Sequence, residues 1–172
     1  MSVLCCHLPD FVLELSRRQE PRSAERAGPL LLLDAEERVC ALSPEARRAG
    51  LRRGMPAREA RRRCPEARLR PLDGPAGQAG QAAFLAELGQ WELPVEELGW
   101  GAAYLDLAAV AARPEEAQPL AAELGRRLRT ELGLAPALGW DSGKFTARAA
   151  ALSSRPGHMR LVGRAQEAAF LA

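Results

Sequence analysis

Apolar residues in the first half of the chain come in short runs that end at prolines or polar residues. Short runs bounded in this way are typical of buried strands. We predict strands over residues 3–8, 30–33 and 39–42. A helix-like pattern at 11–19 separates the first two strands. Two short helices follow, one at 44–48 with Ser43 as its N-cap and one from Pro56 to about Cys64.

The second half of the chain alternates helical and strand-like patterns. The stretch 71–80 is rich in glycine and proline and predicts a junction between two subdomains. Leucines then recur every four residues within 115–132 and predict the longest helix, with Gly133 as its C-cap. We also predict helices at 81–90 and 143–152, and strands at 95–98, 102–107, 136–140 and 158–162.

The order of these elements predicts an α/β (α+β) fold. With residues up to about 72 set aside, the order strand, helix, strand, strand, helix, strand is that of a ferredoxin-like domain. At 172 residues the chain can bury a core, and its length fits one domain or one domain with a substantial insertion. We therefore expect a ferredoxin-like subdomain with a smaller subdomain inserted after its first strand.

Composition excludes several classes of protein. No span approaches the roughly 18 uninterrupted apolar residues of a membrane helix, and the amino terminus lacks the basic region of a secretory signal. The four cysteines form no C-x-x-C pair and have no histidine cluster nearby, so a zinc site is not expected. We expect a cytoplasmic protein with buried thiols, no membrane association, and no metal or other cofactor.

Basic residues gather in one part of the chain. Residues 47–70 hold ten arginines and two acids, a net charge of +8, whereas the whole chain carries +2. Such a block is a candidate footprint for nucleic-acid phosphates, although a solvated helical face gives the same pattern. No aromatic residue interleaves the block, so base stacking is not expected there. The predicted DNA-contacting residues are Arg52, Arg53, Arg58, Arg61, Arg62 and Arg63.

Several islands of sequence resemble motifs of the Y-family DNA polymerases. Residues 101–107, GAAYLDL, resemble the palm motif S-x-D-E-A-Y-L-D. Residues 43–56 resemble the fingers pattern A-R-x-x-G-x-x-x-G-M-P, and residues 139–148 resemble G-x-A-x-x-K-F-L-A-[KR]. Arg155-Pro156-Gly157 resembles the K-P-x-G turn that follows. The likeness covers almost the entire chain in the expected order, which makes it more specific than any one motif.

The resemblance implies a division of the chain. Residues 1–10 and 73–172 correspond to a ferredoxin-like palm, and residues 11–72 correspond to a small fingers subdomain inserted after the first strand. Because the sequence ends at Ala172, we expect the thumb and little finger of the family to be absent from this chain.

The departures from the family pattern concern the metal ligands. His7, Gly101 and Ala102 stand where the resemblance places metal-binding carboxylates. Hard divalent ions are held by carboxylate oxygens, and neither Gly101 nor Ala102 has one. We therefore predict a degenerate polymerase that is not an enzyme, with no catalytic residue and no bound metal. The alternative is a residual nucleotidyltransferase whose ligands would be His7, Asp10 and Asp106.

Two positive positions match family residues that hold the triphosphate of the incoming nucleotide. They are Arg47 and Lys144. Without a metal to screen the triphosphate, two cations give modest affinity. We therefore interpret them as residual scaffold or a weak phosphate site.

The degenerate pattern is most similar to ImuB-type proteins, which are Y-family relatives without a catalytic triad. That resemblance implies a scaffold or adaptor in DNA damage tolerance, that is, in translesion synthesis and induced mutagenesis. The implied partners are a RecA-like protein, an error-prone polymerase and the sliding clamp, with DNA as a possible further partner. We accordingly expect a cytoplasmic, nucleoid-associated protein. A small DNA-binding module that uses the arginine block is the alternative function.

Overall fold

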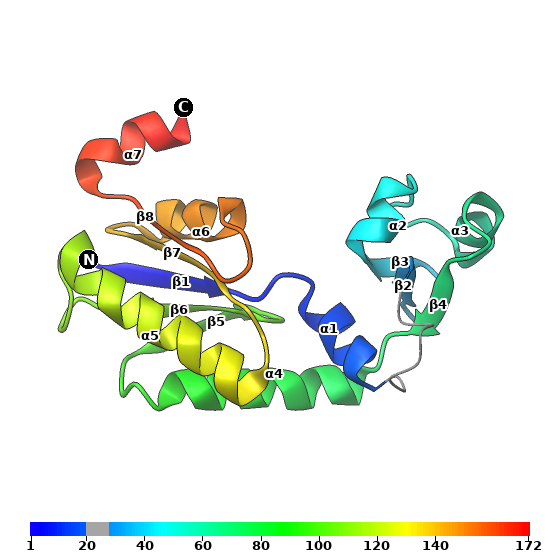
Figure 1. The fold of residues 1–172 in the computed structure, drawn as a ribbon, viewed down its shortest axis with the longest axis horizontal. Coiled ribbons are helices and arrows are strands. Elements are labelled where there is room, and N and C mark those ends of the chain that lie inside the picture. Colours follow the sequence, from blue (N-terminus) through cyan, green and yellow to red (C-terminus); the bar gives the residue numbers. More distant parts are fainter. Residues whose placement is uncertain (20–27) are drawn as a thin grey trace. The chain divides into compact units, whose positions relative to one another are not determined.

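The computed structural model describes residues 1–19 and 28–172. The chain separates into two compact units (Figure 1). The larger unit comprises Met1–Pro9 and Gln81–Ala172, and the smaller unit comprises Asp10–Gly80. The smaller unit is thus inserted after the first strand of the larger one.

The larger unit contains a mixed five-stranded sheet in the order β5-β6-β1-β7-β8. Its strands are β1 (Val3–His7), β5 (Val95–Gly99), β6 (Ala102–Asp106), β7 (Ala137–Asp141) and β8 (Met159–Leu161). Its helices are α5 (Pro114–Leu132), α6 (Lys144–Ser153), α7 (Arg164–Leu171) and the part of α4 (Gly74–Gly89) that follows Gly80. When β8, α6 and α7 are left out, the elements of this unit follow the order β1, α4, β5, β6, α5, β7. This is the ferredoxin-like order of strands and helices, which confirms the predicted fold class.

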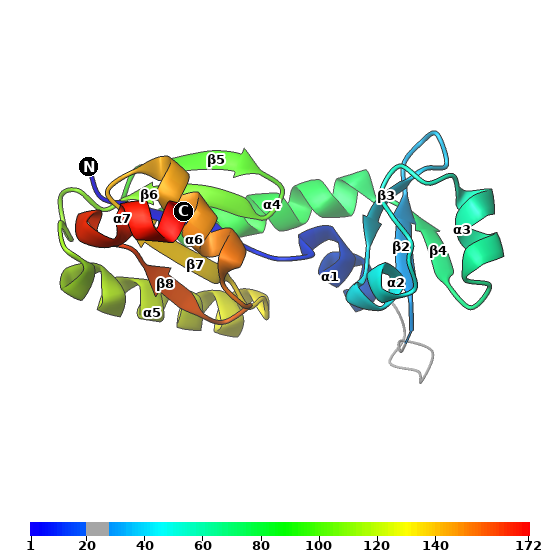
Figure 2. The same ribbon diagram turned by 90° about the horizontal axis from the view of Figure 1, so that it is seen from above.

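The central strand β1 has both faces covered. Val3 and Cys5 pack with Tyr104 of β6 and with Ala147 and Ala151 of α6. Because side chains alternate along a strand, the neighbouring apolar residues of β1 face the opposite layer. That layer is formed by α4 and α5, as Figure 1 shows, and Figure 2 shows α6 over the other face of the sheet. Burial on both faces explains why β1 reads as a continuous apolar run.

Helix α6 lies unusually close to β7 because of one glycine. A Cβ atom placed on Gly139 would lie 2.1 Å from the carbonyl oxygen of Ala147 and 2.2 Å from the amide nitrogen of Ala151. Any side chain at this position therefore requires the helix backbone to move. The small residues of α6 allow the contact, since Ala147, Ala150 and Ala151 are all fully buried.

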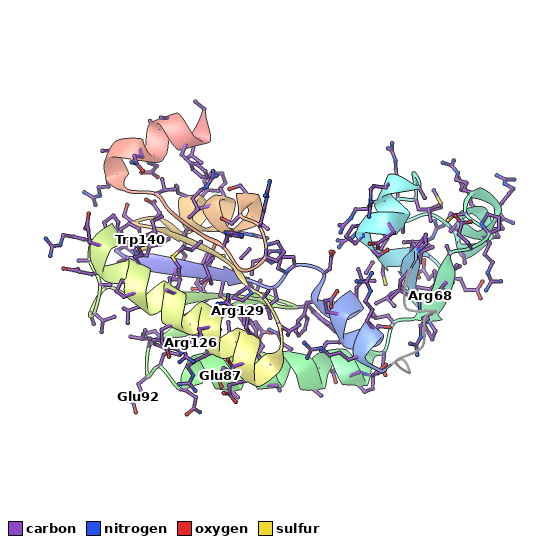
Figure 3. The ribbon with its side chains drawn as sticks, viewed as in Figure 1. Arg68, Glu87, Glu92, Arg126, Arg129 and Trp140 are labelled. Carbon is purple, nitrogen blue, oxygen red and sulfur yellow. The ribbon has the colours of Figure 1, made fainter. Side chains whose placement is uncertain are left out.

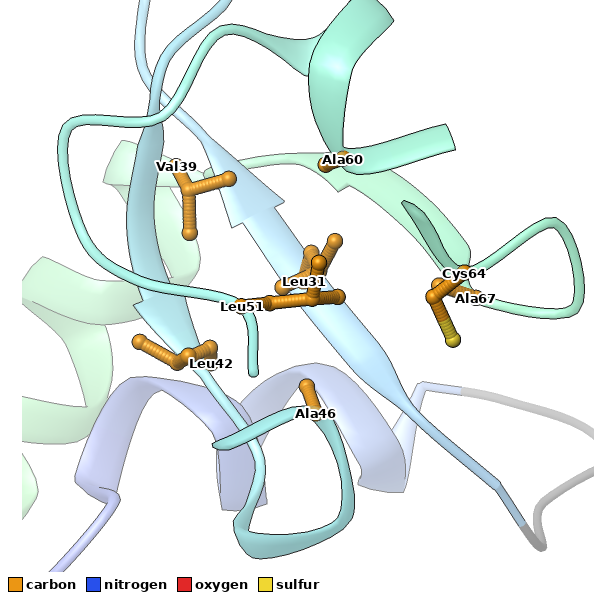
Figure 4. Packing of buried hydrophobic residues seen from close by; sticks show 8 residues of the cluster. All are labelled: Leu31, Val39, Leu42, Ala46, Leu51, Ala60, Cys64 and Ala67. Carbon is orange, nitrogen blue, oxygen red and sulfur yellow. The ribbon is translucent and has the colours of Figure 1, made fainter. Parts of the chain in front are cut away.

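The smaller unit contains a three-stranded sheet in the order β3-β2-β4. Its elements are α1 (Phe11–Arg18), β2 (Leu30–Leu33), β3 (Val39–Leu42), α2 (Pro44–Arg48), α3 (Ala57–Arg63) and β4 (Arg68–Pro71). One core cluster lies under α2 and α3, as Figure 4 shows: Leu31, Val39, Leu42, Ala46, Leu51, Ala60, Cys64 and Ala67. A second cluster joins Leu13 of α1 to Leu30, Leu32 and Ala41. The three-stranded sheet of the smaller unit therefore has apolar residues packed on both of its faces.

Three elements differ from the sequence prediction. Strand β4 was not predicted, and it pairs in parallel with β2. Helix α4 begins at Gly74, so most of the predicted junction at 71–80 is helical. The side chain of Asp73 accepts a hydrogen bond from the Ala76 amide at 2.9 Å and caps this helix. Helix α7, also not predicted, has no buried residue.

Among the residues described, no helix has the length and apolar character needed to cross a bilayer.

Candidate functional site

The three positions that correspond to metal ligands lie together at one end of the sheet in the larger unit. His7 is opposite Ala102 in the antiparallel pairing of β1 with β6. The amide of Leu8 donates a hydrogen bond of 2.7 Å to the carbonyl oxygen of Gly101. The strand register therefore brings His7, Gly101 and Ala102 side by side, as the resemblance implies.

The turn between β5 and β6 is fixed by a buried glutamine. The amide of Gly101 donates to Oε1 of Gln81 at 2.7 Å, and Nε2 of Gln81 donates to Glu97 Oε1 at 2.9 Å and to the Gly99 carbonyl at 3.2 Å. Gln81 is only 8% exposed. Gly101 has a φ of 69°, a left-handed conformation that favours glycine. Gly101 thus occupies a backbone position that suits glycine.

These positions do not fit a pair of divalent cations. Gly101 and Ala102 offer no side-chain oxygen, and His7 offers a nitrogen where hard ions prefer oxygen. Among residues 1–19 and 28–172 there is no group of three or more His, Cys, Asp or Glu side chains placed to hold a metal ion.

Asp106 lies at the other end of β1. It pairs with Val3, whereas His7 pairs with Ala102. Four residues of strand separate the two ends, a distance of about 13 Å at roughly 3.3 Å per residue. The alternative ligand set of His7, Asp10 and Asp106 is therefore not assembled by this sheet.

Lys144 also lies away from His7. It opens α6 three residues after Asp141, which is opposite Val3 at the far end of β1. Its ammonium group pairs with Glu96 and lies 5.6 Å from the centre of the Tyr104 ring. The Tyr104 hydroxyl donates to the Lys144 carbonyl at 3.1 Å, and burial raises the pKa of this phenol. Lys144 is thus held at the edge of a separate pocket of about 310 Å³.

The turn 155–157 lies at the His7 end. The amide of Gly157 donates to the carbonyl of Pro136 at 2.8 Å, and the next residue, Ala137, is opposite His7. Arg155 is exposed in this turn. The sequence interpretation named Arg155 only as part of a turn. Its cationic position in the K-P-x-G pattern was the available signal for a site residue.

In the smaller unit, Arg47 is engaged by a carboxylate. Its Nη2 atom donates to both carboxylate oxygens of Asp10 at 2.9 Å. The Arg47 side chain is 48% exposed and that of Asp10 is 24% exposed. Ser43 accepts a hydrogen bond from the Ala46 amide at 3.3 Å and caps α2, so the helix that presents Arg47 begins where the sequence predicts.

Most of the arginine block of the smaller unit is exposed, whereas Arg68 and Arg70 are half-buried. The buried side of α3 is formed by Ala57 and Ala60, which leaves its arginines to solvent. Arg63 pairs with Glu59 at 2.7 Å. In the described part of the chain, no acid pairs with the other predicted DNA-contacting residues, namely Arg52, Arg53, Arg58, Arg61 and Arg62. These charges are therefore available to an anionic partner.

Solved structures of known polymerases share this fold. DinB from Sulfolobus solfataricus matches with a TM-score of 0.86 and 21% identity over 96% of this chain and 49% of its own. A post-insertion binary complex of Dbh DNA polymerase matches with a TM-score of 0.87 and 22% identity over 99% of this chain and 51% of its own. The fold is that of a Y-family polymerase palm and fingers, which confirms the predicted fold class.

Sequence comparison then gives the family. The chain belongs to the impB/mucB/samB family, whose sequence model matches residues 7–151. DNA polymerase IV 2 of Mycobacterium tuberculosis is 36% identical over 118 residues, or 69% of this chain and 34% of the relative. DNA polymerase IV of Methanoculleus marisnigri is 29% identical over 177 residues, or 99% of this chain and 48% of the relative. The chain thus spans between a third and a half of the length of these relatives.

These names correct one prediction. The chain was expected not to be an enzyme, but its relatives are named DNA polymerase IV and its structural neighbours are Y-family polymerases. The prediction rested on side chains at three positions of one sheet end. Ligands for a metal ion can come from several elements of a fold, so the residue types at these three positions do not decide the activity.

Proposed function

We propose that this domain acts in translesion synthesis by docking on DNA through the arginine surface of the smaller unit. The observation that carries the proposal is that Arg52, Arg53, Arg58, Arg61 and Arg62 are exposed and have no acidic partner within the described residues. Arginines that neutralise phosphates release condensed counterions, which gives affinity without sequence preference. Family membership supports DNA as the anion.

An adaptor role extends this proposal. The ImuB-like pattern at His7, Gly101 and Ala102 supports a scaffold that links DNA to a RecA-like protein, an error-prone polymerase and the sliding clamp. Arg47 and Lys144 remain candidate phosphate contacts in this scheme, and each lies in a different unit. Nucleoid association follows if the domain is bound to DNA.

The test is fluorescence anisotropy of a labelled primer-template duplex titrated with the chain at several salt concentrations. The double variant Arg61→Glu and Arg62→Glu should weaken binding at least ten-fold and reduce the salt slope by about two, because each lost phosphate contact removes roughly 0.9 from the slope. Unchanged affinity in this variant would remove the arginine surface from the proposal.

The matched control places the same charge change elsewhere. Arg126 and Arg129 are exposed on α5 of the larger unit, as Figure 3 shows. The double variant Arg126→Glu and Arg129→Glu has the same net charge as the test variant. It should keep most of the wild-type affinity if the contact is local, whereas equal losses in both variants would indicate a response to net charge only.

A second candidate function is nucleotide incorporation, which the names of the relatives favour. The three positions at the β1–β6 end supply no carboxylate, so this activity would need ligands from other parts of the chain. Primer extension by the purified chain with Mg²⁺ and with Mn²⁺ tests this. Single-nucleotide extension in proportion to the amount of chain supports the second candidate, and no extension with either ion contradicts it.

A further inference from the structure

Arg47 is bound by a carboxylate that comes from a distant part of the sequence. The two Asp10 oxygens both lie 2.9 Å from the same guanidinium nitrogen, Nη2. No other side-chain hydrogen bond of Arg47 is found among the described residues, so its Nε and Nη1 donors face no protein acceptor there. A guanidinium has five N–H donors in a fixed fork. Most of that capacity is open to a ligand.

Asp10 adopts an uncommon backbone conformation to make this contact. Its φ is 53° and its ψ is 29°, in the left-handed region, which non-glycine residues rarely occupy. It is the N-cap of α1, yet its side chain makes no capping hydrogen bond. An aspartate at this position normally accepts from the helix amides. Here the carboxylate is directed to Arg47 instead.

We propose that Asp10 acts as a built-in competitor at Arg47, which the proposed function already names as a candidate phosphate contact. The Asp10 carboxylate takes the place that a phosphate oxygen would take on Nη2. A phosphate ligand must displace it or bind beside it against its charge. Asp10 therefore lowers the affinity of Arg47 for phosphate. This inference rests on the proposed function, because it names a regulator of one of its phosphate contacts.

Neighbouring ion pairs do not offer the same arrangement. Arg48 is 3.5 Å from Glu45, and Arg17 lies 3.3 Å from Glu45 and 3.1 Å from Glu14. These acids belong to the same helix as at least one of their partners. The acid on Arg47 comes instead from the start of α1. The Arg17–Glu45 pair also joins α1 to α2, but Glu45 has a second cationic partner in Arg48, whereas within the described residues Asp10 pairs with Arg47 alone.

Substituting Asp10 by asparagine tests the competition directly. Asparagine keeps the shape of the side chain and tolerates positive φ, so Asp10→Asn should fold normally. Partly exposed ion pairs are worth little, which corresponds to a competition of up to about five-fold in affinity. We expect Asp10→Asn to bind inorganic tripolyphosphate about five-fold more tightly than wild type. Binding is followed by titration of the Arg47 Nε–Hε resonance in an arginine-selective NMR spectrum.

Two further variants complete the test. The double variant Asp10→Asn and Arg47→Gln should lose the gain, which shows that the gain acts through Arg47. Glu45→Gln removes an acid of the same charge that pairs with Arg17 and Arg48 rather than with Arg47, and it should leave affinity unchanged. Equal affinity of wild type and Asp10→Asn overturns the proposal, and so does an equal gain in Glu45→Gln.

A parallel titration with a short DNA duplex separates the two sources of phosphate. A gain with tripolyphosphate alone assigns the site to the phosphate chain of a nucleotide, whereas a gain with both assigns it to phosphate oxyanions in general, the DNA backbone included. The effect of Asp10→Asn can be judged separately from the effect of substitutions in the arginine surface. Loss of DNA binding in Arg61→Glu and Arg62→Glu with no effect of Asp10→Asn would retain the proposed function and reject only this inference.

Discussion

At the residue scale, one glycine determines the fit of a helix on the sheet. A Cβ atom on Gly139 would lie within 2.2 Å of two backbone atoms of α6. Backbone atoms cannot move aside as a flexible side chain can. The absence of a side chain at position 139 is therefore a requirement of packing.

Substitution of this glycine should destabilise the protein. We expect Gly139→Ala to lower the free energy of unfolding by about 3 kcal/mol, the upper part of the range for overpacked cores. Urea unfolding followed by circular dichroism measures the change. Gly89→Ala is the matched control, because a Cβ atom there meets nothing within 4 Å. Equal stability of Gly139→Ala and wild type would contradict the packing argument.

A buried thiol should make stability depend on alkaline pH. Burial raises the pKa of Cys5 to about 12, and the nearby charge of Arg148 lowers it only in part. The unfolded thiol titrates near pH 8.5. The folded pKa is the higher one, so its contribution to stability is full below about pH 8.5 and is lost as the pH rises toward 12.

The expected observation is a fall in the free energy of unfolding between pH 8 and pH 10.5. Cys5→Ala should show a smaller fall, because one of the groups responsible is gone. Burial also raises the pKa of Cys6, so part of the dependence should persist. Urea unfolding at the two pH values provides the measurement, and identical falls in the two proteins would exclude Cys5 as a cause.

Some residue contacts were beyond sequence reasoning. The resemblance placed His7, Gly101 and Ala102 in one site, and the strand register brings them together. It did not foresee that Asp10 binds Arg47. A motif indicates which residues share a role in a family. An ion pair between two charged residues also depends on backbone angles, such as the positive φ of Asp10, and the sequence pattern does not show these angles.

At the scale of elements, a single helix residue holds the β5–β6 turn. The buried Gln81 accepts from Gly101 and donates to Glu97 and Gly99. Removing it leaves the amide of Gly101 without its acceptor. A buried donor without a partner costs about 1 to 3 kcal/mol.

Gln81→Ala should therefore loosen the turn. We expect faster hydrogen exchange at the Gly101 amide and a loss of about 2 kcal/mol in the free energy of unfolding. Gln78→Ala, on an exposed position of the same helix, should change neither. Exchange at Gly101 that is as slow in Gln81→Ala as in wild type would mean that another acceptor holds the turn.

The elements that the sequence did not predict correctly have few apolar residues in a regular helical or strand pattern. Strand β4 alternates arginines with Leu69 and ends at Pro71, so the arginine block concealed its strand pattern. Helix α4 was predicted to begin too late because glycine and proline suggested a loop. Its start has Asp73 as N-cap, and the hydrogen bond from Ala76 lowers the pKa of this carboxyl. Proline in a first helical turn is well tolerated.

At the scale of the whole molecule, the order of apolar segments was sufficient to predict the class of fold. The continuous run of β1 and the leucine repeat of α5 both correspond to buried elements. The compact units divide at Pro9 and Gly80, and the predicted boundaries after residues 10 and 72 stay a prediction. The division at Gly80 lies inside helix α4, at the end of the stretch 71–80 that is rich in glycine and proline.

The insertion of the smaller unit after β1 has a consequence for synthesis of the chain. β1 leaves the ribosome before its neighbours β6 and β7, which lie beyond residue 100. At roughly 5 to 20 residues per second, the central strand waits several seconds for its partners, whereas the smaller unit can close its own sheet in that interval. The nascent chain therefore carries β1 as an unpaired apolar strand during that interval, which makes this segment the expected target of chaperones during translation.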